Sequence, residues 1–148
     1  MHINEAIRNR ASTRAFEDRA VPRDLIHDIL DTARWAPSGV NTQPWQVAVV
    51  SGETKQKMGD ALVEARKSGQ IPNPDYKYYA ERFVDPYRSR QKACGFALYG
   101  ALGIEHGDKE ARIAQWLKNY HGFGAPIELL FFVDAMLEKG SWLDMGMF

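Results

Sequence analysis

Apolar side chains recur every three or four residues along much of the chain, the spacing that places them on one face of a helix. Two other runs are typical of buried strands: Trp45–Val50 is rich in β-branched residues, and only Glu128 interrupts the apolar run Ile127–Val133, so we predict a strand over each. The helical spacing predicts helices at Ile3–Arg10, at about Pro22–Arg34, after a cap at Thr54, at about Ser89–Leu102 and after a cap at Asp108.

The segment Ser68–Arg90 lacks this periodicity. It contains three prolines and four tyrosines, and it is long for a simple connection between helices. Segments of this length without regular structure are more often lids or binding loops than passive connectors. We therefore expect it to cover a binding site.

The last residues predict the beginning of another helix. Ser141 and Asp144 have the spacing of a capping residue and an acidic residue in the first turn. An apolar stripe begins at Leu143 and Met147, and the sequence ends at Phe148. We expect the chain to lack the C-terminal part of a larger domain, and to expose apolar surface around Leu143 and Met147.

The composition indicates one globular domain over residues 1–148, with 45% hydrophobic and 26% charged residues. The 19 basic and 19 acidic residues give no net charge, so we expect neither nucleic acid nor a membrane surface as partner. The most apolar stretch, Leu129–Val133, is too short to cross a bilayer. The single cysteine, Cys94, predicts a reducing, cytoplasmic location, and we expect it to be packed among its small neighbours.

The first candidate binding segment follows the first helix. In an extended backbone, alternate side chains face the same way, so Arg10, Ser12 and Arg14 share one face. Two guanidinium groups beside a hydroxyl can bind a phosphate through charge-assisted hydrogen bonds. A solvated basic turn is the alternative, and this pattern alone does not exclude it.

The second candidate segment is the loop Trp35–Trp45. Its prolines and Gly39 restrain the backbone and let it approach a ligand closely. Ser38, Asn41 and Gln43 carry hydroxyl and amide groups that can pair with a planar heterocycle. A rigid turn flanked by two core tryptophans explains the pattern equally well.

The other candidate chemistries receive no support from the sequence. The histidines show no metal-ligand spacing with one another or with Cys94, so we predict no metal site. The glycines of the small-residue helix do not follow a strand at the spacing of a dinucleotide-binding loop.

Together the two segments resemble the FMN-dependent nitroreductase family. Its members have Arg-x-Ser-x-Arg near the N-terminus and Ala-Pro-Ser-x-x-Asn-x-Gln-Pro-Trp at about the interval found here. The runs Phe123–Pro126 and Trp142–Gly146 are similar to that family as well, so the resemblance extends from Ile3 to Phe148. It implies an α+β fold, an α-β-α sandwich in which helices flank a mixed sheet, and a homodimer that binds FMN at its interface.

The resemblance also implies the function. Electrons would pass from NAD(P)H through FMN to an electron-poor acceptor such as a nitroaromatic or a quinone, stacked under the tyrosine-rich segment. The flavin performs this chemistry, so we nominate no catalytic side chain. The implied phosphate, ribityl and pyrimidine contacts are Arg10, Ser12 and Arg14, and the implied contacts to the ring of the partner's flavin are Pro37, Ser38, Gly39, Asn41 and Gln43.

Two alternatives remain at this point. The chain could be a relative that uses flavin electrons for reductive dehalogenation or flavin fragmentation. It could instead be a truncated, non-catalytic domain that binds flavin loosely or only dimerises, because family members continue beyond this length.

Overall fold

The computed structural model describes residues 2–148 as two compact units. The first unit consists of the residues up to Asp60 together with His121–Phe148, and the second is Ala61–Tyr120. The long helix α3 (Gly52–Lys67) begins in the first unit and ends in the second. The prediction of one domain over residues 1–148 stays a prediction.

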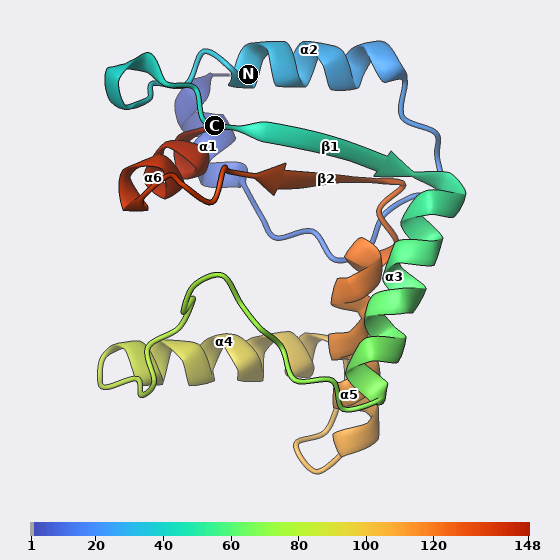
Figure 1. Cartoon of the computed structure of the whole chain (residues 1–148). Helices are drawn as coiled ribbons and strands as arrows, with labels where there is room; N and C mark the ends of the chain where they lie inside the picture. Colours follow the sequence, from blue (N-terminus) through green and yellow to red (C-terminus); the bar gives the residue numbers. More distant parts are fainter. Residues whose placement is uncertain (1) are drawn as a thin grey trace. The chain divides into compact units, whose positions relative to one another are not determined.

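The first unit is built around a two-stranded antiparallel sheet (Figure 1). Its strands β1 (Gln46–Ser51) and β2 (Ile127–Phe132) lie where the sequence predicts them, and Gln46 pairs with Phe132 while Ser51 pairs with Ile127. The unit also contains α1 (Ile3–Asn9), α2 (Arg23–Ala33), α6 (Lys139–Met147) and the 3-10 turns η1 (Gly39–Asn41) and η2 (Lys118–Gly124), the last of which begins in the second unit.

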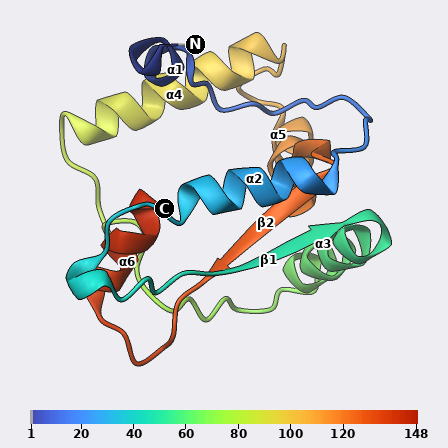
Figure 2. The same ribbon diagram turned by 90° about the horizontal axis from the view of Figure 1, so that it is seen from above.

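Helix α2 lies along one face of this sheet (Figures 1 and 2). The sequence predicts an apolar stripe on α2, and two of its members, Ile26 and Leu30, face the strand residues Val49 and Ile127. A cavity of about 460 Å³ separates the helix from the strands. The apolar face of α2 is therefore turned toward the sheet without packing tightly against it.

The second unit contains α4 (Tyr87–Ala101), α5 (Lys109–Leu117) and the end of α3. Asp108 caps α5 as predicted, because its carboxylate accepts a hydrogen bond from the Ala111 amide. The predicted stop at Gly69 is also present: its φ is +79°, and the Gln70 amide bonds back to the Ala65 carbonyl. This is the Schellman arrangement, which favours glycine at the left-handed position.

The predicted N-caps of two other helices are wrong. Helix α3 begins at Gly52, directly after β1, so Thr54 lies within its first turn. Helix α6 begins at Lys139, so Ser141 and Asp144 both lie inside it. In both cases the helix begins before the predicted capping residue.

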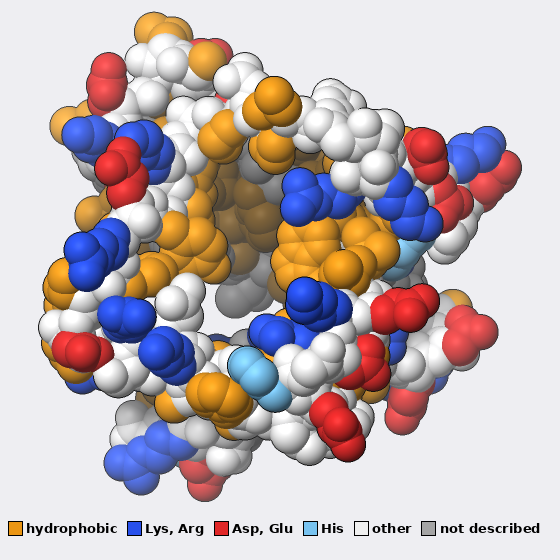
Figure 3. All heavy atoms as spheres, turned by 90° about the horizontal axis from the view of Figure 1, so that it is seen from below, with side chains coloured by type: hydrophobic (Ala, Val, Ile, Leu, Met, Phe, Trp, Pro, Cys, Tyr) orange, Lys and Arg blue, Asp and Glu red, His pale blue; other side chains and the backbone are white. Residues whose placement is uncertain are grey.

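Apolar side chains remain open to solvent over both units. Among residues 2–148 Pro44 is buried, and every other apolar side chain is at least partly exposed. Figure 3 shows many of them, in orange, on the surface among lysines and arginines. The expected exposure near the end of the chain is confirmed, since Leu143 is 70% and Met147 46% exposed. The prediction that Cys94 is packed is wrong, because its side chain is exposed.

The helices and the sheet confirm the α+β class. A mixed sheet requires a parallel pair as well, and the strands of the described residues form only the antiparallel pair. No helix within residues 2–148 is long and apolar enough to span a membrane.

Candidate functional site

The basic segment Arg10–Arg14 leaves α1 in an extended direction. Arg10 follows the last helical residue with φ −60° and ψ 124°, and the segment as a whole is exposed. The Arg10 guanidinium and the Ser12 hydroxyl make no hydrogen bond or ion pair with any residue of 2–148. Arg14 donates a hydrogen bond of 3.2 Å to the Ser12 carbonyl and pairs with no carboxylate in that range. Both guanidinium groups are thus open to an external anion.

Phe123 supports the Arg14 guanidinium. The guanidinium carbon lies 5.6 Å from the centre of the Phe123 ring, within the range of a cation–π contact. Phe123 has a φ of +55° and lies between Gly122 (φ +53°) and Gly124 (φ +84°), so three successive residues of η2 are left-handed. Residues 123–126 form one of the runs that resemble the family, but the sequence does not predict the contact between Phe123 and Arg14.

A buried ion pair lies next to η2. Lys55 of α3 lies 3.3 Å from the Glu128 carboxylate of β2, and the two side chains are 9% and 17% exposed. The Lys55 ammonium also donates a hydrogen bond of 2.9 Å to the His121 carbonyl. Lys55 therefore connects α3, β2 and η2. Glu128, the one charged residue in an apolar strand, was the only signal of this arrangement in the sequence.

The loop before β1 has an unusual backbone. Val40, Asn41 and Gln43 all have positive φ values, of 46°, 58° and 49°. The left-handed region is uncommon for asparagine and glutamine and is a marked outlier for a β-branched valine. Such residues often cluster where a protein binds a ligand.

The side chains of this loop face solvent. Trp35 is 80% and Val40 97% exposed, so Trp35 is not a core residue of the described chain. The Gln43 side-chain amide donates to Asn41 Oδ1 at 3.1 Å, and within residues 2–148 the Asn41 side-chain amide donor and the Gln43 side-chain acceptor have no partner. A donor beside an acceptor suits the edge of a planar heterocycle.

Helix α6 contacts this loop through Asp144. Asp144 is 7% exposed, and its carboxylate accepts a hydrogen bond of 3.1 Å from the Gly39 amide. The sequence pattern predicts Asp144 at a helix start and does not predict this contact. No pattern within either segment could have indicated it, because the two residues are 105 positions apart.

The two candidate segments belong to the same unit but do not touch through polar groups. No hydrogen bond or ion pair within residues 2–148 joins Arg10–Arg14 to Pro37–Gln43. The resemblance assigns them to different flavins of a dimer, so one chain does not need to bring them together. The roles of all eight predicted residues stay predictions at this point.

The tyrosine-rich segment lies in the second unit. Residues 70–86 form no helix or strand, and the aromatic rings contact one another, with Tyr78 and Tyr79 edge to face at 4.6 Å. Four tyrosines of this region are at least half exposed: Tyr76, Tyr78, Tyr79 and Tyr87. Its predicted role as a cover over a binding site stays a prediction.

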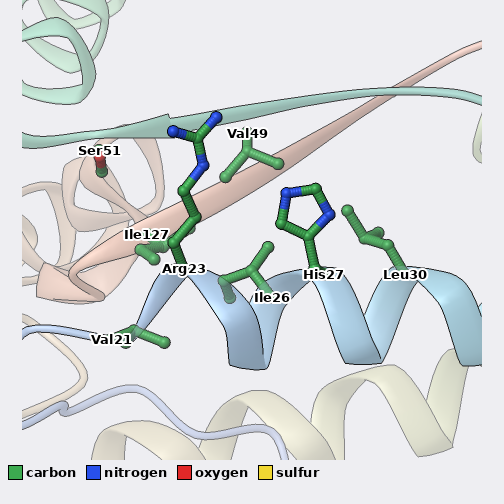
Figure 4. Close-up of a pocket in the computed structure, with 8 residues that line it drawn as sticks. All are labelled: Val21, Arg23, Ile26, His27, Leu30, Val49, Ser51 and Ile127. Atoms are coloured by element: carbon green, nitrogen blue, oxygen red, sulfur yellow. The ribbon is translucent and has the colours of Figure 1, made fainter.

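The cavity between α2 and the sheet contains none of the predicted site residues. In Figure 4 the side chains of Arg23 and His27 point from α2 toward the strands, beside the apolar residues Ile26 and Leu30. Nothing about this cavity corresponds to the phosphate or heterocycle contacts that the sequence predicts. Within residues 2–148 no group of three or more potential metal ligands occurs.

Known nitroreductases match nearly the whole of this chain in sequence. The nitrobenzene nitroreductase of Ectopseudomonas oleovorans is 34% identical, over 99% of this chain and 65% of its own length. The 4-nitrobenzoate reductase of Pseudomonas putida is 38% identical, over 99% of this chain and 63% of its own. This chain therefore spans just under two thirds of the length of these relatives.

Solved structures show the same fold. The FMN and NADPH-dependent nitroreductase from sphigopyxis sp. strain HMH superimposes with a TM-score of 0.92 at 44% identity, over 99% of this chain and 66% of that one. The FMN-dependent nitroreductase from Mycobacterium smegmatis in complex with NADPH gives 0.89 at 30% identity, over 97% and 64%. The predicted nitroreductase-like α+β fold is confirmed. The profile of the Nitroreductase family matches residues 7–147, so this chain belongs to that family.

Proposed function

We propose that this chain is part of an FMN-dependent oxidoreductase that takes electrons from NAD(P)H and reduces an electron-poor aromatic compound, such as a nitroaromatic or a quinone. The observation that carries the proposal is the pair of exposed guanidinium groups at Arg10 and Arg14, which no carboxylate of residues 2–148 neutralises. Family membership supports it, as do relatives named for the reduction of nitrobenzene and nitrobenzoate.

The basic segment has the donors that a flavin phosphate needs. Arg10 and Arg14 would supply charge and paired N–H donors, and the Ser12 hydroxyl would add a further hydrogen bond. The Phe123 ring beneath Arg14 restricts the positions that this guanidinium can adopt, which lowers the entropy lost when a ligand binds.

The loop Pro37–Gln43 fits the ring system. Pro37 and Gly39 present exposed backbone without a bulky side chain, so a planar ring can approach closely. Ser38 Oγ accepts a hydrogen bond of 3.0 Å from the Gln43 amide, which closes the loop and turns Asn41 and Gln43 outward. We propose that Asn41 and Gln43 contact the polar edge of the flavin held by a partner subunit.

The protein's contribution to the reaction is binding and orientation. Bound FMN would accept a hydride from the reduced nicotinamide and deliver the electrons to the acceptor at the same position. The chain would hold the flavin, keep one of its faces open to both substrates in turn and stabilise its negative charge through Arg10 and Arg14. We assign no side chain as acid, base or nucleophile.

The functional unit that we propose is a homodimer. The many half-exposed apolar side chains, among them Leu143, Phe131 and Trp116, are more than a monomer normally leaves in water. A cytoplasmic location remains our proposal from the single cysteine.

The test is flavin retention by the purified chain. The visible spectrum would be recorded after addition of FMN and removal of unbound ligand, and again after addition of NADH or NADPH. We expect a retained flavin band that NAD(P)H bleaches and that a nitroaromatic restores. A folded chain that retains flavin but never bleaches would support the non-catalytic alternative and contradict the proposed activity.

A matched pair of variants tests the phosphate contact. Arg14→Ala should weaken FMN binding about tenfold or more, because a hydrogen bond to a charged group contributes about 1.5–3 kcal/mol. Arg8→Ala removes an equal charge from the last turn of α1, outside the predicted segment, and should leave binding nearly unchanged. Equal effects of the two variants would show that only net charge matters and would refute the assigned contact.

A further inference from the structure

The loop Pro37–Gln43 has a strained backbone. Val40, Asn41 and Gln43 have φ values of 46°, 58° and 49°. Each such residue costs free energy relative to an ordinary conformation, and it persists only where surrounding contacts hold it. Some contact must therefore compensate for the strain.

Several hydrogen bonds within the loop fix its internal shape. The Gln43 backbone amide donates to Ser38 Oγ at 3.0 Å, and the Thr42 backbone amide donates to the Gly39 carbonyl at 3.1 Å. The Asn41 amide donates to the Ser38 carbonyl at 3.0 Å. All of these bonds join residues of the loop to one another, so they do not determine where the loop lies relative to the rest of the unit.

Asp144 provides the connection to another element. Its carboxylate accepts from the Gly39 amide at 3.1 Å, and within residues 2–148 no other hydrogen bond links Pro37–Gln43 to the rest of the chain. Asp144 is 7% exposed, which is unusual for a charged residue. Asp144 lies inside α6, where it is not needed to cap the helix.

An aromatic contact supports the same arrangement. Phe148 lies directly after α6, and its ring centre is 4.9 Å from that of Trp45, the residue at the end of the loop. Phe148 also lies 6.0 Å from Phe131 of β2. Helix α6 is thus braced against the sheet, so Asp144 presents its carboxylate to Gly39 from a fixed position.

We propose that Asp144 is the positioning residue of the flavin-contacting loop: its buried carboxylate holds the Gly39 amide and so sets where Pro37–Gln43 meets the ring. This inference rests on the proposed function. An ionised carboxylate is a stronger hydrogen-bond acceptor for a backbone amide than a neutral group is, which suits a contact that positions the loop.

The first experiment measures the loop itself and requires no flavin. Hydrogen–deuterium exchange of the peptide covering residues 38–43 would be compared between the wild-type chain and Asp144→Ala. We expect exchange to become about tenfold faster or more on loss of a charge-assisted hydrogen bond. Amides of β1 and β2 serve as the internal reference, and their unchanged protection shows that the unit remains folded.

Two further variants separate positioning from charge. Asp144→Asn keeps an acceptor for the Gly39 amide and should recover much of the protection. Glu138→Gln removes a carboxylate from the N-terminal end of the same helix, where it forms no capping bond, and should change nothing in the loop. If Asp144→Ala leaves loop exchange within about twofold of wild type while the strands stay protected, the proposal is wrong.

The second experiment measures FMN affinity by quenching of flavin fluorescence. We expect Asp144→Ala to weaken binding about tenfold and Asp144→Asn to weaken it less, with Glu138→Gln equal to wild type. Equal FMN affinities of the wild-type chain and Asp144→Ala would overturn the inference. A wild type that binds no FMN overturns the proposed function instead, and the exchange experiment still decides whether Asp144 holds the loop.

Discussion

The buried pair Lys55–Glu128 gives a sharp stability prediction. The two charges are 3.3 Å apart and nearly shielded from water. At an effective dielectric constant of about 20, their attraction is about 5 kcal/mol, which offsets the cost of removing both ions from water. Replacing Lys55 by Met leaves the Glu128 carboxylate without its partner and the His121 carbonyl without its donor. We expect Lys55→Met to lower the free energy of unfolding by about 3 kcal/mol.

The assay is urea unfolding followed by circular dichroism, on four proteins: wild type, each single variant and the double variant. Glu128→Leu alone should also cost about 3 kcal/mol, whereas the double variant should cost only about 1 kcal/mol, for the unsatisfied His121 carbonyl. Lys57→Met is the control, because its ion pair with Glu53 on the same helix is exposed and should contribute under about 0.5 kcal/mol. A double variant that loses the sum of both single losses would refute the reasoning.

Three further predictions concern backbone conformation and capping, all measured as the free energy of unfolding. Gly122→Ala should destabilise more than Gly124→Ala: both require a left-handed alanine, at about 1 kcal/mol or more, but only at position 122 would the new Cβ lie 2.5 Å from the Glu128 carboxylate. Equal losses would show that Glu128 moves aside freely. Asp108→Ala should cost about 1 kcal/mol as the loss of the α5 cap, and Asp108→Asn should cost less. Thr54→Ala should change stability by less than about 0.5 kcal/mol, because Thr54 is not a cap; a loss of about 1 kcal/mol would restore the original prediction.

The helices and strands were predictable where their signals are local. The stop of α3 depends on Gly69 and the start of α5 on Asp108, and in each case one residue satisfies the backbone groups of the adjacent turn. The strands were recognisable as β-branched or continuously apolar runs. The predicted starts of α3 and α6 were wrong because Thr54 and Ser141, although favourable capping residues, lie inside these helices and do not cap them.

The contacts that position the candidate site were not predictable in this way. Lys55 and Glu128 are far apart in the sequence, and an isolated lysine on a helix is normally a solvated residue. Asp144 and Gly39 pair across most of the chain. Periodicity reports which face of an element is apolar, but it does not report which polar group a distant segment will meet.

The candidate residues could be proposed from the sequence because their chemistry is local. Arg10 and Arg14 flank a hydroxyl within five positions, and Asn41 and Gln43 lie two positions apart in a restrained loop. The family resemblance then favoured the prediction of a ligand-binding segment over that of a solvated turn. The exposure of Trp35 contradicts only the alternative's premise that Trp35 is a core residue, and the assignment of the loop to a ligand stays a prediction.

A buried charged side chain supports each candidate segment. In the proposed site these charged side chains contact neither the phosphate nor the ring of the flavin. Lys55 and Glu128 hold η2, whose Phe123 lies beneath Arg14, and Asp144 holds Gly39 of the loop. Apolar packing contributes little here, because Pro44 is the only buried apolar side chain among residues 2–148. Polar contacts of defined length therefore position the site, and such contacts are directional where apolar packing is not. It follows that flavin binding should be sensitive to substitutions at these buried charges even though they lie outside the ligand contacts.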